Sequence, residues 1–286
     1  MKKDNLGKIL IGLMGIALLI TLIAAINVIR ISADYKRSEG IYTEAAGDYT
    51  RIEPVHISES SAVGEENTNS SSEDSDYGKS SLNIIEADIE GLRKINPEVA
   101  GWLYFENEDI SYPLMQTVDN ERYLKEAFDG TRSSAGSIFL DYRNSVDLTD
   151  CNSVIYGHNM KDLSMFGRLR YYKTGEEYTE SHKFFQIYTG ECIYRYEVIG
   201  CRDISANSDI YVSFDLSDSD EIRLMQNEIM KGSYINSGET LSEEQRYVTL
   251  STCSVDESVR FVVLGKQIDI IVHDTPDPQS SITDGL

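Results

Sequence analysis

One of the four cysteines, Cys253, lies where two strand-like segments meet. The apolar, β-branched runs 247–252 and 259–263 are typical of two neighbouring strands, with Cys253 ending the first and Arg260 beginning the second. A thiolate is a strong nucleophile, and a guanidinium can stabilise the oxyanion that its attack creates. The pair therefore indicates acyl-transfer chemistry, although a lone cysteine is more often a buried structural residue.

A second candidate is His158. It comes shortly after another strand-like run, 154–156, and is separated from that run by Gly157. An imidazole can take a proton from a thiol or stay cationic beside a thiolate, and it can protonate a leaving amine. Taken alone, a histidine is more often structural. Together with Cys253 and Arg260, it would complete the groups needed for nucleophilic catalysis.

The remaining cysteines, Cys151, Cys192 and Cys201, show no metal-binding spacing. Cys192 and Cys201 flank the strand-like run 193–200, and an extended strand of that length holds its ends too far apart for a disulfide. The acidic run 217–221 lacks the glycine and the distal glutamate of a calcium loop and is typical of a helix N-terminus. We therefore expect mostly free thiols, and no metal or other cofactor.

The N-terminal segment predicts a membrane anchor. Residues 9–29 carry no charge and are long enough to cross a hydrocarbon core of about 30 Å. Basic side chains lie on both sides of this segment, so the long acidic region that follows decides the orientation. We expect a cytoplasmic N-terminus (1–8), an uncleaved anchor (9–29) and the rest of the chain outside the cell membrane; a weak alanine-containing cleavage site makes a signal peptide the alternative.

The composition changes again after the anchor. Residues 1–37 contain six basic and two acidic side chains, a balance of +4, so the formal net charge of −22 leaves about −26 on the rest of the chain, which argues against nucleic acid as a partner. Residues 58–81 are rich in Ser, Glu, Asp and Asn and have almost no large apolar side chain. We therefore expect a disordered extracytoplasmic linker over residues 30–80.

Residues 81–273 are long enough for one substantial core, followed by a flexible tail over 274–286. The spacing predicts helices over 82–95, 120–128 and 219–231. Strands are predicted over 99–105, 110–115, 136–142, 152–156, 184–188, 193–204, 246–251 and 259–271. The first two of these strands predict a hairpin. About eight short strands and a few helices favour a mainly β (α+β) fold: a closed or nearly closed eight-stranded barrel with N-terminal helices and a helical insertion before the last strands.

Several motifs in this order resemble the sortases, and within them class B. The run Thr249-Leu250-Ser251-Thr252-Cys253 matches the TLxTC signature, with Tyr156-Gly157-His158 before it and Arg260 after it. Further similar segments are 95–103, 112–116, 119–124, 136–144 and 166–169. The resemblance extends over essentially the whole of residues 82–272.

The resemblance implies a membrane-tethered cysteine transpeptidase of a Gram-positive surface. Cys253 would attack the carbonyl after threonine in an LPxTG- or NPxTN-like C-terminal sorting signal of a surface protein. An amine of peptidoglycan or a pilin lysine would then release the acyl group. His158 would act as general acid and base and Arg260 as oxyanion clamp. The class B groove implies substrate-binding roles for Asn120, Leu124, Tyr156, Ser251 and Thr252.

Two other classes of protein are weighed against this interpretation. A papain-like hydrolytic peptidase places its cysteine early, on a helix N-terminus, and its histidine late, whereas His158 precedes Cys253 here. A non-catalytic extracellular binding module would use Cys253 and His158 only as structural residues. Replacing Cys253 by alanine separates the catalytic from the structural interpretation.

Overall fold

The structure, a computed structural model, describes residues 2–56, 81–211, 217–235, 237–253 and 258–272. The expected tail over 274–286 lies outside these residues. The helices are α1 (Lys2–Tyr49), α2 (Ile89–Ile95), α3 (Glu176–Ser181) and α4 (Asp218–Met225), with 3-10 turns η1 (Arg122–Leu124), η2 (Gly167–Thr174) and η3 (Asp209–Tyr211) and a π-helical turn η4 (Gln226–Met230). The strands are β1 (Thr50–His56), β2 (Ser81–Ala87), β3 (Val99–Phe105), β4 (Ser111–Met115), β5 (Ile138–Leu140), β6 (Asn152–Gly157), β7 (Phe184–Tyr188), β8 (Cys192–Ser205), β9 (Tyr247–Cys253) and β10 (Val259–Val272).

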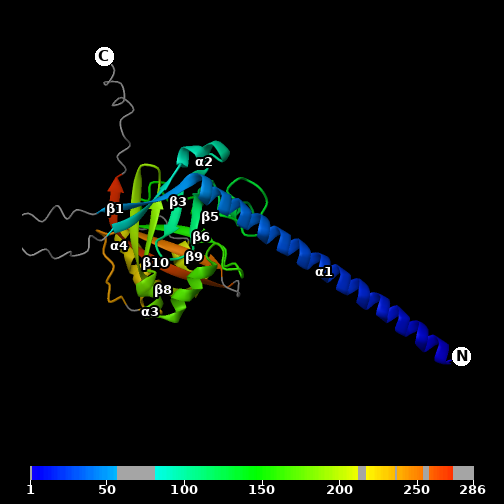
Figure 1. The fold of residues 1–286 in the computed structure, drawn as a ribbon. Coiled ribbons are helices and arrows are strands. Elements are labelled where there is room, and N and C mark those ends of the chain that lie inside the picture. The colour runs from blue at the N-terminus through cyan, green and yellow to red at the C-terminus, as the bar shows by residue number, and fades with distance from the viewer. Residues whose placement is uncertain (1, 57–80, 212–216, 236, 254–257, 273–286) are drawn as a thin grey trace, which may run out of the picture.

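Eight strands close into a barrel in the order β10-β8-β7-β3-β4-β5-β6-β9 (Figure 1). This confirms the predicted eight-stranded barrel, and the antiparallel pair of β3 and β4 confirms the predicted hairpin. Two neighbouring pairs, β4–β5 and β6–β9, are parallel. Because β6 and β9 run in the same direction, their C-terminal ends lie at the same end of the barrel.

Two apolar clusters account for most of the burial. The larger one fills the barrel and includes a row of stacked rings from Phe105, Phe185 and Tyr196, with centroids 5.0 Å apart in each neighbouring pair. A smaller cluster lies on the outside of β9 and β10, where Met225 and Ile229 of α4 and η4 cover the strands. The predicted helical insertion before the last strands is therefore present, although it changes from α- to π-helix after Met225.

Helix α1 differs from the prediction because it continues beyond the expected anchor as far as Tyr49. Tyr42 and Ala45 are 5% and 2% exposed, and Tyr35 and Tyr49 also pack against the core. These side chains are three, four or seven residues apart, so they form one apolar stripe that binds the helix to the barrel. The disordered linker expected over 30–80 is therefore not seen for residues 30–56, and its remaining part, 57–80, lies outside the described residues.

The N-terminal half of α1 extends away from the barrel (Figure 1). The segment 12–49 of this helix includes an 18-residue window with a mean hydropathy of 2.5, none of it buried. By length and composition this part of the helix is able to cross a membrane.

The helix predicted over 82–95 is instead a strand followed by a shorter helix. Strand β2 pairs with β1, which sequence reasoning had assigned to the linker. Asp88 then caps α2 by accepting a hydrogen bond from the Gly91 amide at 2.8 Å. The helix predicted over 120–128 is reduced to the single turn η1, and the helical segments η2 and α3 were not predicted.

Candidate active site

Strand register brings the three predicted catalytic residues to one end of the barrel. In the parallel pair β6–β9, Tyr156 lies opposite Ser251 and Gly157 lies opposite Thr252. His158 directly follows β6 and Cys253 is the last residue of β9, so their backbones are neighbours. In the antiparallel pair β9–β10, Cys253 lies directly opposite Arg260. The side chain of Cys253 lies outside the described residues.

A backbone carbonyl group contacts the imidazole ring of His158. Its Nε2 lies 2.8 Å from the carbonyl oxygen of Leu124, at the end of η1. Because a carbonyl oxygen only accepts hydrogen bonds, Nε2 carries the proton of this bond, and Nδ1 is the ring atom left to exchange a proton. The His158 side chain is half-buried.

The position before His158 favours glycine, because any larger residue would displace buried side chains. A Cβ atom on Gly157 would lie 2.5 Å from Cδ1 of Ile138 and 2.7 Å from Cδ2 of Phe166. The Phe166 amide also donates to the carbonyl oxygen of His158 at 3.0 Å, which closes the loop behind the histidine. These contacts fix the path of the backbone as it leaves β6 and therefore the origin of the His158 side chain.

Arg260 is the second residue of β10 and is half-buried. Its Nη1 donates to the carbonyl oxygen of Val259 at 3.2 Å. A guanidinium presents several donors in a fixed plane, so this residue has the chemistry needed to bind an oxyanion beside Cys253.

A buried carboxylate, Asp141, binds two of the predicted substrate-binding residues, Asn120 and Tyr156. Its two oxygens accept hydrogen bonds from Asn120 Nδ2 at 2.7 Å, Tyr156 Oη at 2.9 Å, and Nε, Nη2 and the backbone amide of Arg143 at 2.8 to 3.0 Å. Burial acts to raise the pKa of Asp141, but the hydrogen bonds from Arg143, Tyr156 and Asn120 outweigh it and hold this pKa below its usual range. Asp141 is therefore the ionised centre of a polar network.

The network continues from Arg143 to β9 through Tyr211. Arg143 Nη2 donates to the Tyr211 carbonyl oxygen at 2.8 Å, and Tyr211 Oη shares a 2.8 Å hydrogen bond with Ser251 Oγ. The rings of Tyr156 and Tyr211 pack with their centroids 6.1 Å apart. These contacts join five parts of the chain on one side of the candidate site: β5, β6, η3, β9 and the segment that precedes η1.

The five predicted substrate-binding residues all lie near this end of the barrel, in different roles. Asn120 and Tyr156 are half-buried and bind Asp141. Leu124 is half-buried, and its carbonyl group contacts His158. Ser251 and Thr252 are 1% and 2% exposed. Their binding of substrate stays a prediction.

Sequence reasoning missed Asp141, Arg143 and Tyr211 as parts of the site. The first two lie in the segment 136–144 that was compared with class B sortases, and an Asp-x-Arg spacing between two strands was the available signal. Tyr211 lies in the short turn η3 and had no such signal. Its link to Ser251 spans 40 residues and depends on the tertiary fold.

Three cysteines are free thiols, which agrees with the expectation from their spacing. Burial raises the pKa of Cys151 and of Cys201 to about 12, so neither carries an appreciable thiolate fraction at neutral pH. Cys192 is half-buried on β8. Cys253 is the cysteine whose backbone lies beside both a histidine and an arginine.

Comparisons with known proteins agree with this geometry. The family model for the sortase domain matches residues 103–268. Sortase B of Listeria monocytogenes is 32% identical over 187 residues, covering 64% of this chain and 75% of that protein. Sortase B of Staphylococcus aureus is 29% identical over 189 residues, covering 65% and 77% of the two chains.

Solved structures show the same relationship. The crystal structure of sortase B from Bacillus anthracis in complex with AAEK1 superposes with a TM-score of 0.65 at 28% identity, covering 84% of this chain and 100% of that one. The Staphylococcus aureus sortase B–substrate complex gives a TM-score of 0.58 at 29% identity, covering 64% and 84%. The chain therefore belongs to the sortase family of transpeptidases, as a class B sortase.

Proposed function

We propose that Cys253, His158 and Arg260 are the catalytic residues of this transpeptidase. The observation that supports the assignment most directly is the register of β6, β9 and β10, which makes the three backbones neighbours at one barrel end.

In the proposed reaction, the thiolate of Cys253 attacks the carbonyl carbon of the threonine in a C-terminal sorting signal similar to LPxTG or NPxTN. Arg260 stabilises the oxyanion, and the peptide C–N bond breaks as His158 protonates the leaving amine. The product is a thioester between Cys253 and the threonyl carbonyl. An amino group then attacks this thioester, loses its proton and releases the thiol.

We further propose that the acceptor is an amine of peptidoglycan, with a pilin lysine as the alternative, and that the substrate is a surface protein. The hydrogen bond from His158 Nε2 to Leu124 supports the proton-transfer role, since it orients the ring and leaves Nδ1 for exchange. The network around Asp141 supports a substrate groove on this side, because it fixes Asn120, Tyr156 and Ser251 relative to one another.

The apolar part of α1 supports a single-pass anchor with the barrel on the extracytoplasmic face. Because α1 continues without a break to Tyr49, the 20 residues after Ile29 would extend about 30 Å as a helix. The barrel would then be carried on a stiff helix close to the membrane, in place of the flexible linker expected from composition.

The test combines a panel of fluorogenic sorting-motif peptides with an amine acceptor. The purified full chain in detergent should cleave at least one motif and yield a transfer product that contains the amine. Cys253→Ala should lose both activities, whereas Cys192→Ala should keep both. Retained cleavage in Cys253→Ala would refute the nucleophile, and cleavage that yields only hydrolysed product with every amine tested would refute the transfer step.

A further inference from the structure

The barrel-bound half of α1 holds one loop of the catalytic domain by polar contacts. Asp34, Ser38 and Tyr42 recur every four residues and so lie on one side of the helix. Ser134 donates its backbone amide to Asp34 Oδ2 at 3.1 Å, and Ser38 Oγ lies 2.7 Å from Ser133 Oγ. Tyr42, Ser38 and Ser133 are at most 5% exposed, so the Ser38–Ser133 contact is closed to water, whereas the Asp34–Ser134 hydrogen bond is exposed.

Tyr42 makes the last of these contacts. Its hydroxyl donates to the carbonyl oxygen of Gly136 at 2.5 Å and lies 3.1 Å from Ser137 Oγ. Burial raises the pKa of Tyr42, so the hydroxyl stays protonated and remains a donor throughout the working pH range.

The loop 133–137 in turn supports the turn that binds His158. The Ser137 amide donates to the Tyr123 carbonyl oxygen at 2.8 Å, and the Ser133 amide donates to the Lys125 carbonyl oxygen at 2.9 Å. Gly136 adopts a φ of +59°, and a Cβ atom there would lie 2.4 Å from the Tyr123 carbonyl oxygen. The two segments are therefore in close contact on both sides of Leu124.

Leu124 is the residue whose carbonyl oxygen binds His158 Nε2 at 2.8 Å. A continuous series of contacts thus leads from Tyr42, through Gly136 and the turn η1, to the imidazole. We propose that Tyr42 is a positioning residue for His158, so that the anchor helix α1 contributes to catalysis. This proposal rests on the catalytic role proposed for His158.

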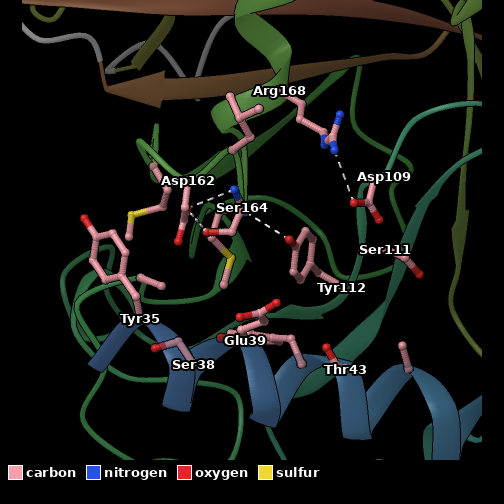
Figure 2. Close-up of a pocket in the computed structure, with 16 residues that line it drawn as sticks. Tyr35, Ser38, Glu39, Thr43, Asp109, Ser111, Tyr112, Asp162, Ser164 and Arg168 are labelled. Atoms are coloured by element: carbon pink, nitrogen blue, oxygen red, sulfur yellow. Dashed lines mark hydrogen bonds and ion pairs between the residues drawn. The ribbon is translucent and has the colours of Figure 1, made fainter. Parts of the chain in front are cut away.

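A second route from α1 to His158 would pass through the loop that follows His158. This route is less direct. A cavity of about 400 Å³ separates α1 from residues 160–165 of that loop. Figure 2 shows Ser38, Glu39 and Thr43 of α1 on one side of the cavity and Asp162 and Ser164 on the other. The effect of α1 on His158 is therefore expected to pass mainly through residues 133–137.

The test replaces Tyr42 by phenylalanine in the full chain, which removes only the hydroxyl. Tyr49→Phe is the matched control, because Tyr49 lies on the same helix and its hydroxyl makes no hydrogen bond among the described residues. Each variant is measured by steady-state turnover of a cleavable sorting peptide, normalised to the folded fraction. Histidine-labelled protein, without substrate, is titrated by NMR, with His182 as internal reference.

Loss of the two buried hydrogen bonds of the Tyr42 hydroxyl should lower kcat of Tyr42→Phe at least about fivefold, with an unchanged KM. The bond from Nε2 to Leu124 is stronger for the imidazolium than for the neutral ring, so a looser bond should move the titration midpoint of His158 to lower pH. Ser38→Ala should change both quantities in the same direction by less, while Tyr49→Phe and the His182 titration should not change.

The proposal would be overturned by a Tyr42→Phe enzyme whose kcat and His158 titration both match wild type, or by one that is less stable but has normal kcat per folded molecule and an unshifted titration. A shifted titration without a change in kcat would also overturn it, because His158 would then be repositioned without effect on turnover. The titration needs no turnover, so it stays informative if His158 proves not to be catalytic. In that case His158→Ala would retain activity, which identifies the failure as one of the proposed function.

Discussion

Replacing Asp141 by asparagine tests whether the polar network holds the candidate site together. The wild-type carboxylate accepts five hydrogen bonds, three of them from Arg143. Asparagine keeps the shape but has one acceptor oxygen, and its amide group would face the donors of Arg143 or Tyr156. The substitution therefore removes the negative charge and leaves the guanidinium without its carboxylate partner.

The expected cost follows from the burial of the pair. Removing one partner of a buried ion pair costs about 3–5 kcal/mol. The Asp141 side chain is 0% exposed, but that of Arg143 is 27% exposed and can be partly rehydrated. We therefore expect the lower end, about 3 kcal/mol, which corresponds to a fall in melting temperature of about 6–12 °C for a domain of this size.

The assay is thermal unfolding of the full chain in detergent, with Asp147→Asn as control. Asp147 is exposed and lies in the same connection between β5 and β6, so its replacement should change the free energy of unfolding by no more than about 0.5 kcal/mol. If the melting temperature of Asp141→Asn falls by less than about 2 °C, or by no more than that of the control, the structural role of the network is refuted.

The pH dependence gives an independent check. The pKa of folded Asp141 lies below its usual range, so its stabilising effect is fully present above the unfolded-state pKa of about 3.9 and is lost as pH falls through the folded-state pKa. The difference in stability between wild type and Asp141→Asn should be constant from about pH 5 to 8 and shrink in stronger acid. A difference that persists unchanged well below the folded-state pKa would contradict the charge as its cause.

Further substitutions test the other parts of the site. Arg260→Lys should lower kcat by about 100-fold or more, because a point charge cannot replace the planar guanidinium; near-normal peptide turnover would exclude the oxyanion role. His158→Ala should abolish turnover at every pH, and recovery at high pH alone would limit His158 to deprotonating the thiol. Tyr211→Phe breaks the hydrogen bond to Ser251 and should cost about 1 kcal/mol in denaturant unfolding; no change would show that the bond is replaced by water. Burial and nearby carboxylates raise the pKa of Glu221 to about 7, so its contribution to wild-type stability falls between about pH 4.5 and 7, and Glu221→Gln should be the more stable protein at pH 8. Equal stability there would indicate a fully hydrated carboxylate.

The barrel was predictable because its strands carry local signals. Residues 184–188 were predicted with the observed bounds, and the predicted hairpin differs from β3 and β4 by one residue. Short β-branched and aromatic runs bounded by polar turns report burial in a sheet directly. The three catalytic candidates were recognisable for the same reason, since each lies at a strand end.

The errors came from segments whose structure depends on distant partners. Strand β2 was predicted as helix because its partner β1 precedes it by a long segment, and an apolar run alone does not distinguish the two. The continuation of α1 was missed because its stripe of Tyr35, Tyr42 and Tyr49 is spaced by sevens among charged residues and gains its stability only by packing on the barrel. The network around Asp141 joins residues up to 68 positions apart, beyond the reach of local patterns.

Intact-mass measurement of the acyl-enzyme tests the central proposal most directly. The full chain is incubated with a sorting-motif peptide without any amine acceptor, quenched in acid and digested to locate the adduct. We predict an added mass equal to the peptide up to its threonine, on Cys253 and absent from Cys253→Ala, with the half-buried Cys192 unmodified in the same sample. Peptide cleavage with the adduct on another residue, or with no adduct formed in the absence of amine across the motif panel, would contradict it.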